Sequence, residues 1–230
     1  MKKIILLSLI VLGTGITLTF TGCSKDDATS PIVTLLGSSS IDIPLNSAPW
    51  TDLLATATDN EDGAITVSSN ASTSNPDVNK SGTYTITYSA TDKAGNEGTV
   101  TRTIRVYNEA EVFAGNYINC FDTCITTPPS AFNSPGIVTL SDSINRLVKI
   151  NNFGAFGSNI GVWVKITGNS AGSQILVASG QSLGGSAQIN AVYPDASKVI
   201  SGNSSSTSFF IKYGWTDGTD SDVCETTYFR

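Results

Sequence analysis

The stretch Gly82-Thr-Tyr-Thr-Ile-Thr-Tyr-Ser-Ala-Thr-Asp92 decides the fold, because apolar side chains alternate along it with threonine and serine. A period of two places the two tyrosines and Ile86 on one face of a β-strand and the threonines on the other. The turn that follows contains Gly95 and Asn96, which accept positive φ angles. Residues 99–106 then return as an antiparallel partner, so the sequence predicts a hairpin with one buried face.

The rest of the chain has the same character. Beyond Ile32 it is rich in Thr, Ser, Val and Ile in short alternating runs that Gly, Asn, Asp and Pro interrupt, and no 3.6-residue apolar period is sustained. We expect an all-β protein: an Ig-like β-sandwich of about seven strands over residues 31–108, then a second antiparallel β-domain of about nine strands over residues 113–230. A lipocalin-like barrel and a sandwich both fit the second domain.

Composition and charge exclude several classes of function. The chain has 230 residues, of which 40% are hydrophobic and 14% charged, so it can bury a core. It has no histidine, which excludes a Ser-His-Asp triad, a Cys-His pair and any imidazole metal ligand. Its formal net charge of -6 repels phosphate backbones, so nucleic acid is not expected as a partner.

The N-terminus carries export and anchoring signals. Two lysines precede the apolar run 4–20, which suits a signal peptide better than a membrane span. Phe20-Thr-Gly-Cys23 resembles a bacterial lipobox, which implies a signal peptide over residues 1–22 and acyl chains on Cys23, with 23–30 as a tether. The alternative is an uncleaved anchor helix. Ser24-Lys-Asp-Asp27 resembles the signal that sends Bacteroidetes lipoproteins to the exterior of the outer membrane.

Motifs in both predicted domains resemble known families. The segments 55–63, 81–88 and 90–96 resemble the bacterial Ig-like surface-protein domain, which implies a spacer or adhesion module without catalytic residues. We expect Tyr84 to tie its hydroxyl back to the backbone as a tyrosine corner. Residues 115–117, 148–153 and 224–228 are similar to the small C-terminal β-domains of Bacteroidetes surface lipoproteins, some of which are lipocalin-like.

Three cysteines remain beyond the lipobox. A disulfide between Cys124 and Cys224 would tie the start of the second domain to its last strand, and Cys120 to Cys224 is the rival pairing. Cys120 and Cys124 are also close enough in sequence to pair. Zinc is a poor fit for three thiols without histidine. We expect one structural disulfide and one free thiol.

Two acidic clusters offer oxygen ligands. Asp59, Asn60 and Asp62, with Asp92 expected nearby, form a candidate calcium site, although tight turns require the same residue types. The second cluster comprises Asp217, Asp220 and Asp222, with Glu225 beyond. Its residue types suit a second calcium loop, a pair of glycosidase carboxylates or a solvated hairpin tip. We favour the turn and the hairpin tip.

Aromatic residues supply the candidate ligand contacts. Tyr213 and Trp215 fall on one strand face, which would stack against sugars if it points outward and belong to the core if it points inward. Trp163, flanked on its strand face by Gly161 and Lys165, is the better candidate for an exposed contact.

These features predict a non-catalytic cell-surface lipoprotein whose Ig-like spacer presents the C-terminal domain to an extracellular ligand. A glycan and a partner outer-membrane protein are the two ligand classes. The alternatives are a lipocalin-like carrier of a small apolar molecule, which requires an interior cavity, and a hydrolase that uses an acid pair.

Overall fold

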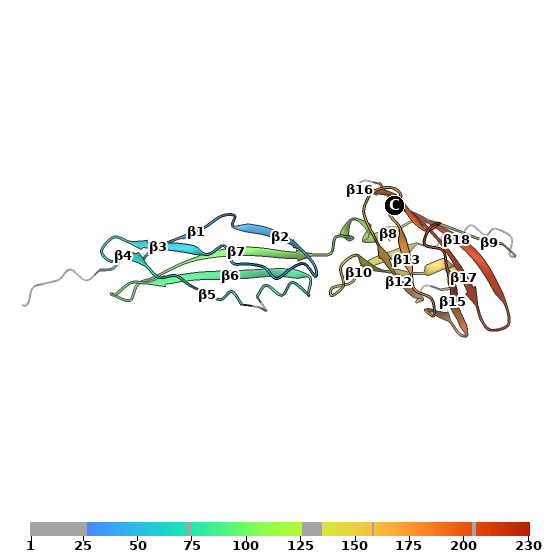
Figure 1. The fold of residues 1–230 in the computed structure, drawn as a ribbon, viewed down its shortest axis with the longest axis horizontal. Coiled ribbons are helices and arrows are strands. Elements are labelled where there is room, and N and C mark those ends of the chain that lie inside the picture. Colours follow the sequence, from blue (N-terminus) through green and yellow to red (C-terminus); the bar gives the residue numbers. More distant parts are fainter. Residues whose placement is uncertain (1–26, 73–74, 126–134, 158, 204–205) are drawn as a thin grey trace, which may run out of the picture.

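The computed structural model describes residues 27–72, 75–125, 135–157, 159–203 and 206–230. Within these ranges every regular element is a strand except two 3-10 turns, η1 (Glu111–Phe113) and η2 (Phe153–Ala155). The prediction of an all-β protein is therefore confirmed. The elements form two units that lie end to end along the longest axis (Figure 1). In the part of the chain that the structure describes, no helix has the length and apolar character needed to cross a membrane.

The first unit holds the seven strands that the sequence predicts. They form two sheets, in the orders β1-β3-β4 and β2-β7-β6-β5. All pairs are antiparallel except β2 with β7. The strands are β1 (Ile32–Leu35), β2 (Ser40–Pro44), β3 (Ala55–Asp59), β4 (Gly63–Ile65), β5 (Ser68–Ser69), β6 (Gly82–Thr91) and β7 (Glu97–Tyr107).

The hairpin of β6 and β7 provides most of the core of this unit. Ile86, Tyr88 and Ala90 of β6 are buried while the threonines between them face outward, as the alternation predicts. The hydroxyl of Tyr84 donates to the carbonyl of Lys80 at 2.8 Å, so the expected tyrosine corner is confirmed.

A buried arginine between the two sheets was not expected. Arg102 of β7 is fully buried and donates to Tyr88 Oη at 2.6 Å, to Asp52 Oδ1 at 3.2 Å and to the carbonyls of Leu36 and Ser38. Burial raises the pKa of Tyr88 to about 12, and the Asp52 carboxylate adds to this rise. These acceptors compensate for the desolvation of the buried cation, so removal of one of them would leave an uncompensated charge between the two sheets.

The second unit holds eleven strands in two antiparallel sheets that share one core. One sheet has the order β13-β12-β11-β10-β8, and the other has the order β14-β15-β17-β18-β9 with β16 paired to β17. The strands are β8 (Gly115–Tyr117), β9 (Asn119–Cys124), β10 (Gly136–Leu140), β11 (Leu147–Asn151), β12 (Gly161–Ile166), β13 (Ile175–Val177), β14 (Ser182–Gly184), β15 (Ala187–Val192), β16 (Lys198–Asn203), β17 (Ser206–Thr216) and β18 (Ser221–Phe229).

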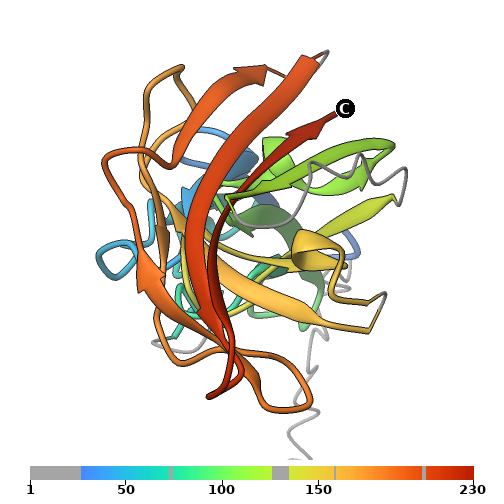
Figure 2. The same cartoon turned by 90° about the vertical axis from the view of Figure 1, so that its right-hand side faces the viewer.

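The larger sheet curls around the core as an open half-barrel (Figure 2). Because the strands separate into two sheets, the described residues form a two-layer structure rather than the closed lipocalin-like barrel. The interior is filled by side chains of both sheets, among them Phe209, Tyr213 and Tyr228, which are each 0% exposed. In the described part of the unit these side chains occupy the space between the sheets, where a carrier of apolar molecules would need a cavity.

Asn108 joins the two units. It is 2% exposed, and its side-chain amide donates to the carbonyls of Ser141 and Ile144 at 3.0 and 3.1 Å. Its Oδ1 accepts from the backbone N–H groups of Ala110 and Arg146 at 3.0 and 2.9 Å. Asn108 is therefore part of the folded second unit, and the connection between the two units is not a free linker.

Further polar contacts cross the joint. The backbone N–H of Ser81 donates to the carbonyl of Asp142 at 2.7 Å, and Asn46 binds the backbone of Ser143 and Asn145. Such contacts oppose bending between the units, because each would have to be exchanged for water.

Candidate functional site

Trp163 lies on β12, on the outer face of the β13-β12-β11-β10-β8 sheet. Its neighbours along β12, Val162 and Val164, point into the core, whereas Trp163 is 40% exposed. On the adjacent strand Lys149 is its register partner. The outward side chains of the face are those of Asn116, Ile137, Thr139, Leu147, Lys149, Asn151, Trp163, Lys165 and Leu176.

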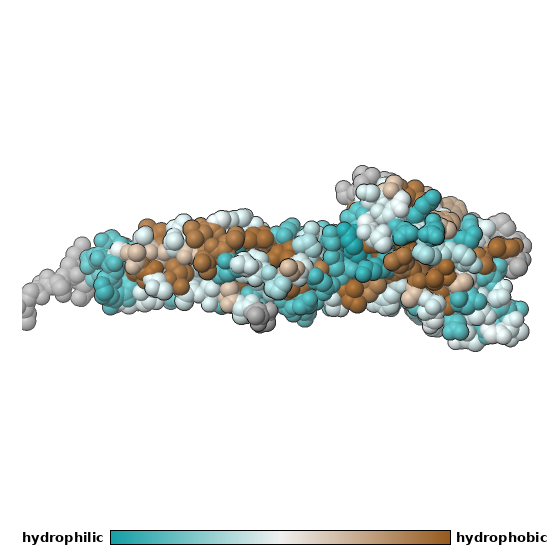
Figure 3. Space-filling view, viewed as in Figure 1, coloured by the Kyte–Doolittle hydropathy of each residue, from teal (hydrophilic) through white to brown (hydrophobic). Residues whose placement is uncertain are grey.

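A shallow concavity of about 450 Å³ opens beside the indole. It is lined by Leu147, Trp163, Lys165, Leu176, Val177, Ala178 and Gln181. In Figure 3 an apolar area covers the part of the second unit where Figure 1 labels β12 and β13. The expectation of an exposed contact at Trp163 thus agrees with its place in the structure.

Gln181 fixes the backbone beneath the indole. β13 pairs with β12 only from Val164 onward, which leaves the backbone groups of Trp163 without a strand partner on that side. The Gln181 side chain fills this place: its Oε1 accepts from the Trp163 N–H at 2.7 Å and its Nε2 donates to the Trp163 carbonyl at 2.8 Å. Nothing in the local sequence signals this role, since Gln181 lies in the loop after β13.

The other two aromatic candidates do not share this exposure. Tyr213 is fully buried and packs against Phe153 with ring centroids 4.7 Å apart. Trp215 is half-buried against Phe156. Tyr213 is therefore a core residue, and its prediction as a ligand contact is wrong because its strand face points inward.

The predicted calcium ligands divide into two groups. Carboxylate oxygens of Asp59 and Asp92 lie within 4.8 Å of each other and of a carboxylate oxygen of Asp27, from the predicted tether. Asp62 instead accepts from the Nζ and the backbone N–H of Lys93, both at 2.7 Å, and these hydrogen bonds lower its pKa. Asn60 is exposed on the turn. Asp62 thus pairs with Lys93 and does not belong to the carboxylate cluster. Asp27 does belong to it, although the sequence did not indicate Asp27 as a calcium ligand.

Asp59 carries the feature that fits a cation. Its Oδ1 accepts from the backbone N–H groups of Glu61 and Asp62, which lowers the pKa of Asp59, in the geometry expected of a turn. Its Oδ2 is buried and has no hydrogen-bond partner among the described residues. Three carboxylates and an unsatisfied oxygen form a donor set of the type that calcium prefers.

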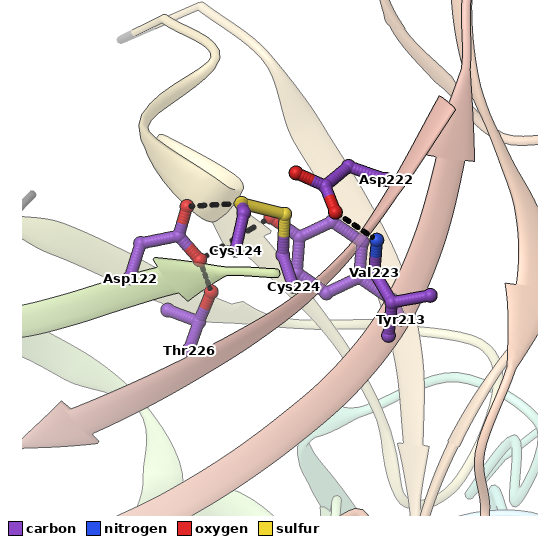
Figure 4. The surroundings of a disulfide bond; sticks show 7 residues. All are labelled: Asp122, Cys124, Tyr213, Asp222, Val223, Cys224 and Thr226. Carbon is purple, nitrogen blue, oxygen red and sulfur yellow. Dashed lines mark hydrogen bonds between the residues drawn. A yellow bond between two sulfur atoms is a disulfide. The ribbon is translucent and has the colours of Figure 1, made fainter. Parts of the chain in front are cut away.

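The structure joins Cys124 and Cys224 by a disulfide, between directly opposed residues of β9 and β18, and leaves Cys120 buried and free (Figure 4). Asp122 lies beside this bond and is 7% exposed. Its Oδ1 accepts from the hydroxyls of Thr226 at 2.5 Å and Tyr213 at 3.5 Å. Burial raises the pKa of the Asp122 carboxyl.

The acids near the C-terminus occupy a hairpin tip. Asp217 accepts from the backbone N–H groups of Thr219 and Asp220, which lowers its pKa and closes the turn between β17 and β18. Glu225 pairs with Lys212 at 2.8 Å, and Asp222 is buried. Asp217 and Asp220 thus lie in the hairpin tip favoured above, whereas Asp222 and Glu225 belong to β18 and Asp222 is not solvated.

Cys23 and residues 1–22 lie outside the described residues, so the lipobox remains a prediction from the sequence.

Comparisons with known proteins give a family for the first unit. No curated protein is detectably similar to the chain. Among solved structures, a lipoprotein from Bacteroides thetaiotaomicron is 13% identical with a TM-score of 0.32, and covers 86% of this chain and 99% of its own. A Clostridium perfringens ZmpB structure, containing a carbohydrate-binding module in complex with GlcNAc and INT domains, is 17% identical with a TM-score of 0.25, and covers 87% of this chain and 44% of its own. Residues 33–106 match the family model of the bacterial surface protein Ig-like domain, and the first unit is a domain of that family.

Proposed function

We propose that this protein is a non-catalytic, lipid-anchored protein of the bacterial surface that binds an extracellular glycan on the outer face of its second unit. Cys23 is the anchoring residue, and the Ig-like unit acts as a stiff spacer between the outer membrane and the binding face. The family match to bacterial surface proteins and the polar joint at Asn108 support the spacer role.

The exposed indole of Trp163 is the single observation that carries this proposal. An exposed aromatic ring can offer its electron-rich face to the C–H groups of a sugar ring. The face around it is mixed, with Asn151 and two lysines near the indole. Such polar groups next to an exposed ring supply the hydrogen-bond partners that fix the orientation of a ligand rich in hydroxyl groups.

Binding of the full chain to a glycan array tests the proposal. We expect Trp163→Ala to lose binding and Trp163→Phe to keep part of it, because phenylalanine retains a ring. Trp215→Phe is the control, since that ring packs against Phe156. Array binding that is unchanged in Trp163→Ala, or capture of only an outer-membrane protein by the wild type, would contradict the glycan assignment. The mass of the N-terminal peptide from cell membranes tests lipidation at Cys23.

A further inference from the structure

We infer that the face around Trp163 selects glycans that carry negative charge, such as polysaccharides with carboxylate or sulfate groups. This inference rests on the proposed function and adds the class of ligand. It arises from the charges around the indole, which differ in sign from those of the protein as a whole.

Lys165 and Lys149 flank Trp163 along β12. Lys165 is two residues further along the same strand face and lines the concavity beside the indole. Lys149 comes from β11, and its side chain extends over Gly161 on the opposite side of Trp163. A Cβ at residue 161 would stand 2.2 Å from Lys149 Cε and 3.1 Å from its Nζ. Glycine at this position therefore leaves room for the lysine to lie against β12.

The two lysines and the indole form one line. Residues 161 to 165 of a strand span about 13 Å, so an ammonium group lies on each side of the ring within the reach of a short oligosaccharide. Asn151 adds an amide at the same end as Lys149, because its Oδ1 would stand 2.6 Å from the same Cβ. A sugar stacked on Trp163 would thus place the acidic groups of its neighbours near Lys149 and Lys165.

No acidic side chain opposes them on this face. None of the outward positions described for β8, β10, β11, β12 and β13 is Asp or Glu. The chain as a whole has a formal net charge of -6. Neither lysine belongs to an ion pair among the described residues, whereas Lys93 and Lys212 are paired with Asp62 and Glu225. The face is therefore a local positive surface on an acidic protein, and charge complementarity favours an anionic ligand.

The experiment compares matched polymers. Full-length protein is titrated with oligogalacturonate and with its carboxyl-reduced, neutral counterpart, and likewise with dextran sulfate and neutral dextran. We expect the charged member of at least one pair to bind about tenfold more tightly or better, with an affinity that falls as salt is raised. The two pairs distinguish carboxylate from sulfate as the recognised group.

Substitutions assign the effect to this face. We expect Lys149→Gln and Lys165→Gln each to weaken binding of the charged polymer about five- to tenfold, and Lys165→Glu to weaken it further. Lys80→Gln is the matched control, because it removes the same charge from an exposed position of the first unit and should leave affinity unchanged. Thermal unfolding of each variant shows that it folds.

Equal binding of charged and neutral polymers, still dependent on Trp163, would overturn this inference and leave the proposed function standing. Unchanged affinity in both lysine variants would overturn it as well. If neither member of any pair binds and the glycan array is also empty, the proposed function fails, and this inference fails with it.

Discussion

At the scale of single residues, Asp122 is the carboxyl that burial affects most clearly. Its carboxylate lies inside the second unit beside the disulfide, and among the described residues its Oδ1 accepts from two hydroxyl groups. Burial disfavours the charged form more than these hydrogen bonds stabilise it, so the pKa of Asp122 is raised. The folded state therefore binds the proton more tightly than the unfolded state does.

This shift predicts the pH dependence of stability. A carboxyl whose pKa is higher in the folded state destabilises the fold as pH rises from its unfolded value, about 4, through its folded value. We expect Asp122→Asn to raise the free energy of unfolding at pH 7, because asparagine keeps an acceptor for Thr226 and Tyr213 without a charge. The gain should shrink as pH falls and vanish below about pH 4.

Chemical denaturation of wild type and Asp122→Asn between pH 3 and pH 8 measures this difference. The comparison isolates Asp122, because carboxylates with lowered pKa, such as Asp62 and Asp217, are present in both proteins. A gain that does not change with pH would show that the charge of Asp122 is not its source.

Asp59 supports a prediction at the same scale. Without a cation, its buried Oδ2 and the carboxylates of Asp27 and Asp92 repel one another. We expect millimolar Ca²⁺ to raise the Tm of the full chain by a few degrees, and Asp59→Asn to abolish this rise. Differential scanning calorimetry with Ca²⁺ or a chelator measures both.

Asp220→Asn is the matched control, because it removes one carboxylate from the exposed hairpin tip far along the chain. An equal rise of Tm in wild type and Asp59→Asn would place the calcium effect elsewhere on the protein.

At the scale of elements, alternation located the strands, but it did not reveal where they change sheets. β4 and β5 follow each other closely in the sequence but belong to different sheets, and the same is true of β8 and β9. A change of sheet depends on which distant strands are available as partners, and the local pattern contains no information about them.

The start of β3 shows a second kind of limit. The apolar pair before it predicts a strand from Leu53, but Leu54 has a φ of 67°, so the strand begins at Ala55. The Asp52 carboxylate accepts from the Leu54 N–H at 3.0 Å, which stabilises this turn. A leucine in the left-handed region is uncommon and cannot be anticipated from its type.

The sequence predicts a candidate ligand-contact residue only where the alternation along a strand determines which way its side chain points. Trp163 lies between two valines whose side chains point into the core, so the alternation along the strand directs the indole outward. Gln181 and Lys149 reach the same place from a loop and from a neighbouring strand, and Asp27 approaches Asp59 from the N-terminal segment. These three depend on tertiary contacts, which a single sequence without an alignment does not give.

At the scale of the whole molecule, the joint determines the orientation of the second unit relative to the first, and under the proposed function it sets how far the face around Trp163 is held from the membrane. The two units would move independently if a flexible linker separated them. Here Asn108 uses both ends of its amide inside the second unit, and Glu109 continues the contact by pairing with Arg146 at 2.8 Å. A rigid rod presents Trp163 at a fixed distance from the anchoring end.

Asn108→Ala is expected to loosen this rod. The substitution removes the amide donor of the Ser141 carbonyl and the Oδ1 acceptor of the Ala110 and Arg146 N–H groups, at a cost of about 1–3 kcal/mol of stability, and frees the backbone that connects the units. NMR relaxation of the variant should then give a separate rotational correlation time for each unit, whereas the wild type should tumble as one anisotropic body. Asn60→Ala, which alters an exposed turn of the first unit, should behave as the wild type. If Asn108→Ala still tumbles as one body, the contacts of Asn46 and Ser81 hold the joint, and Asn46→Ala in the same background should release it.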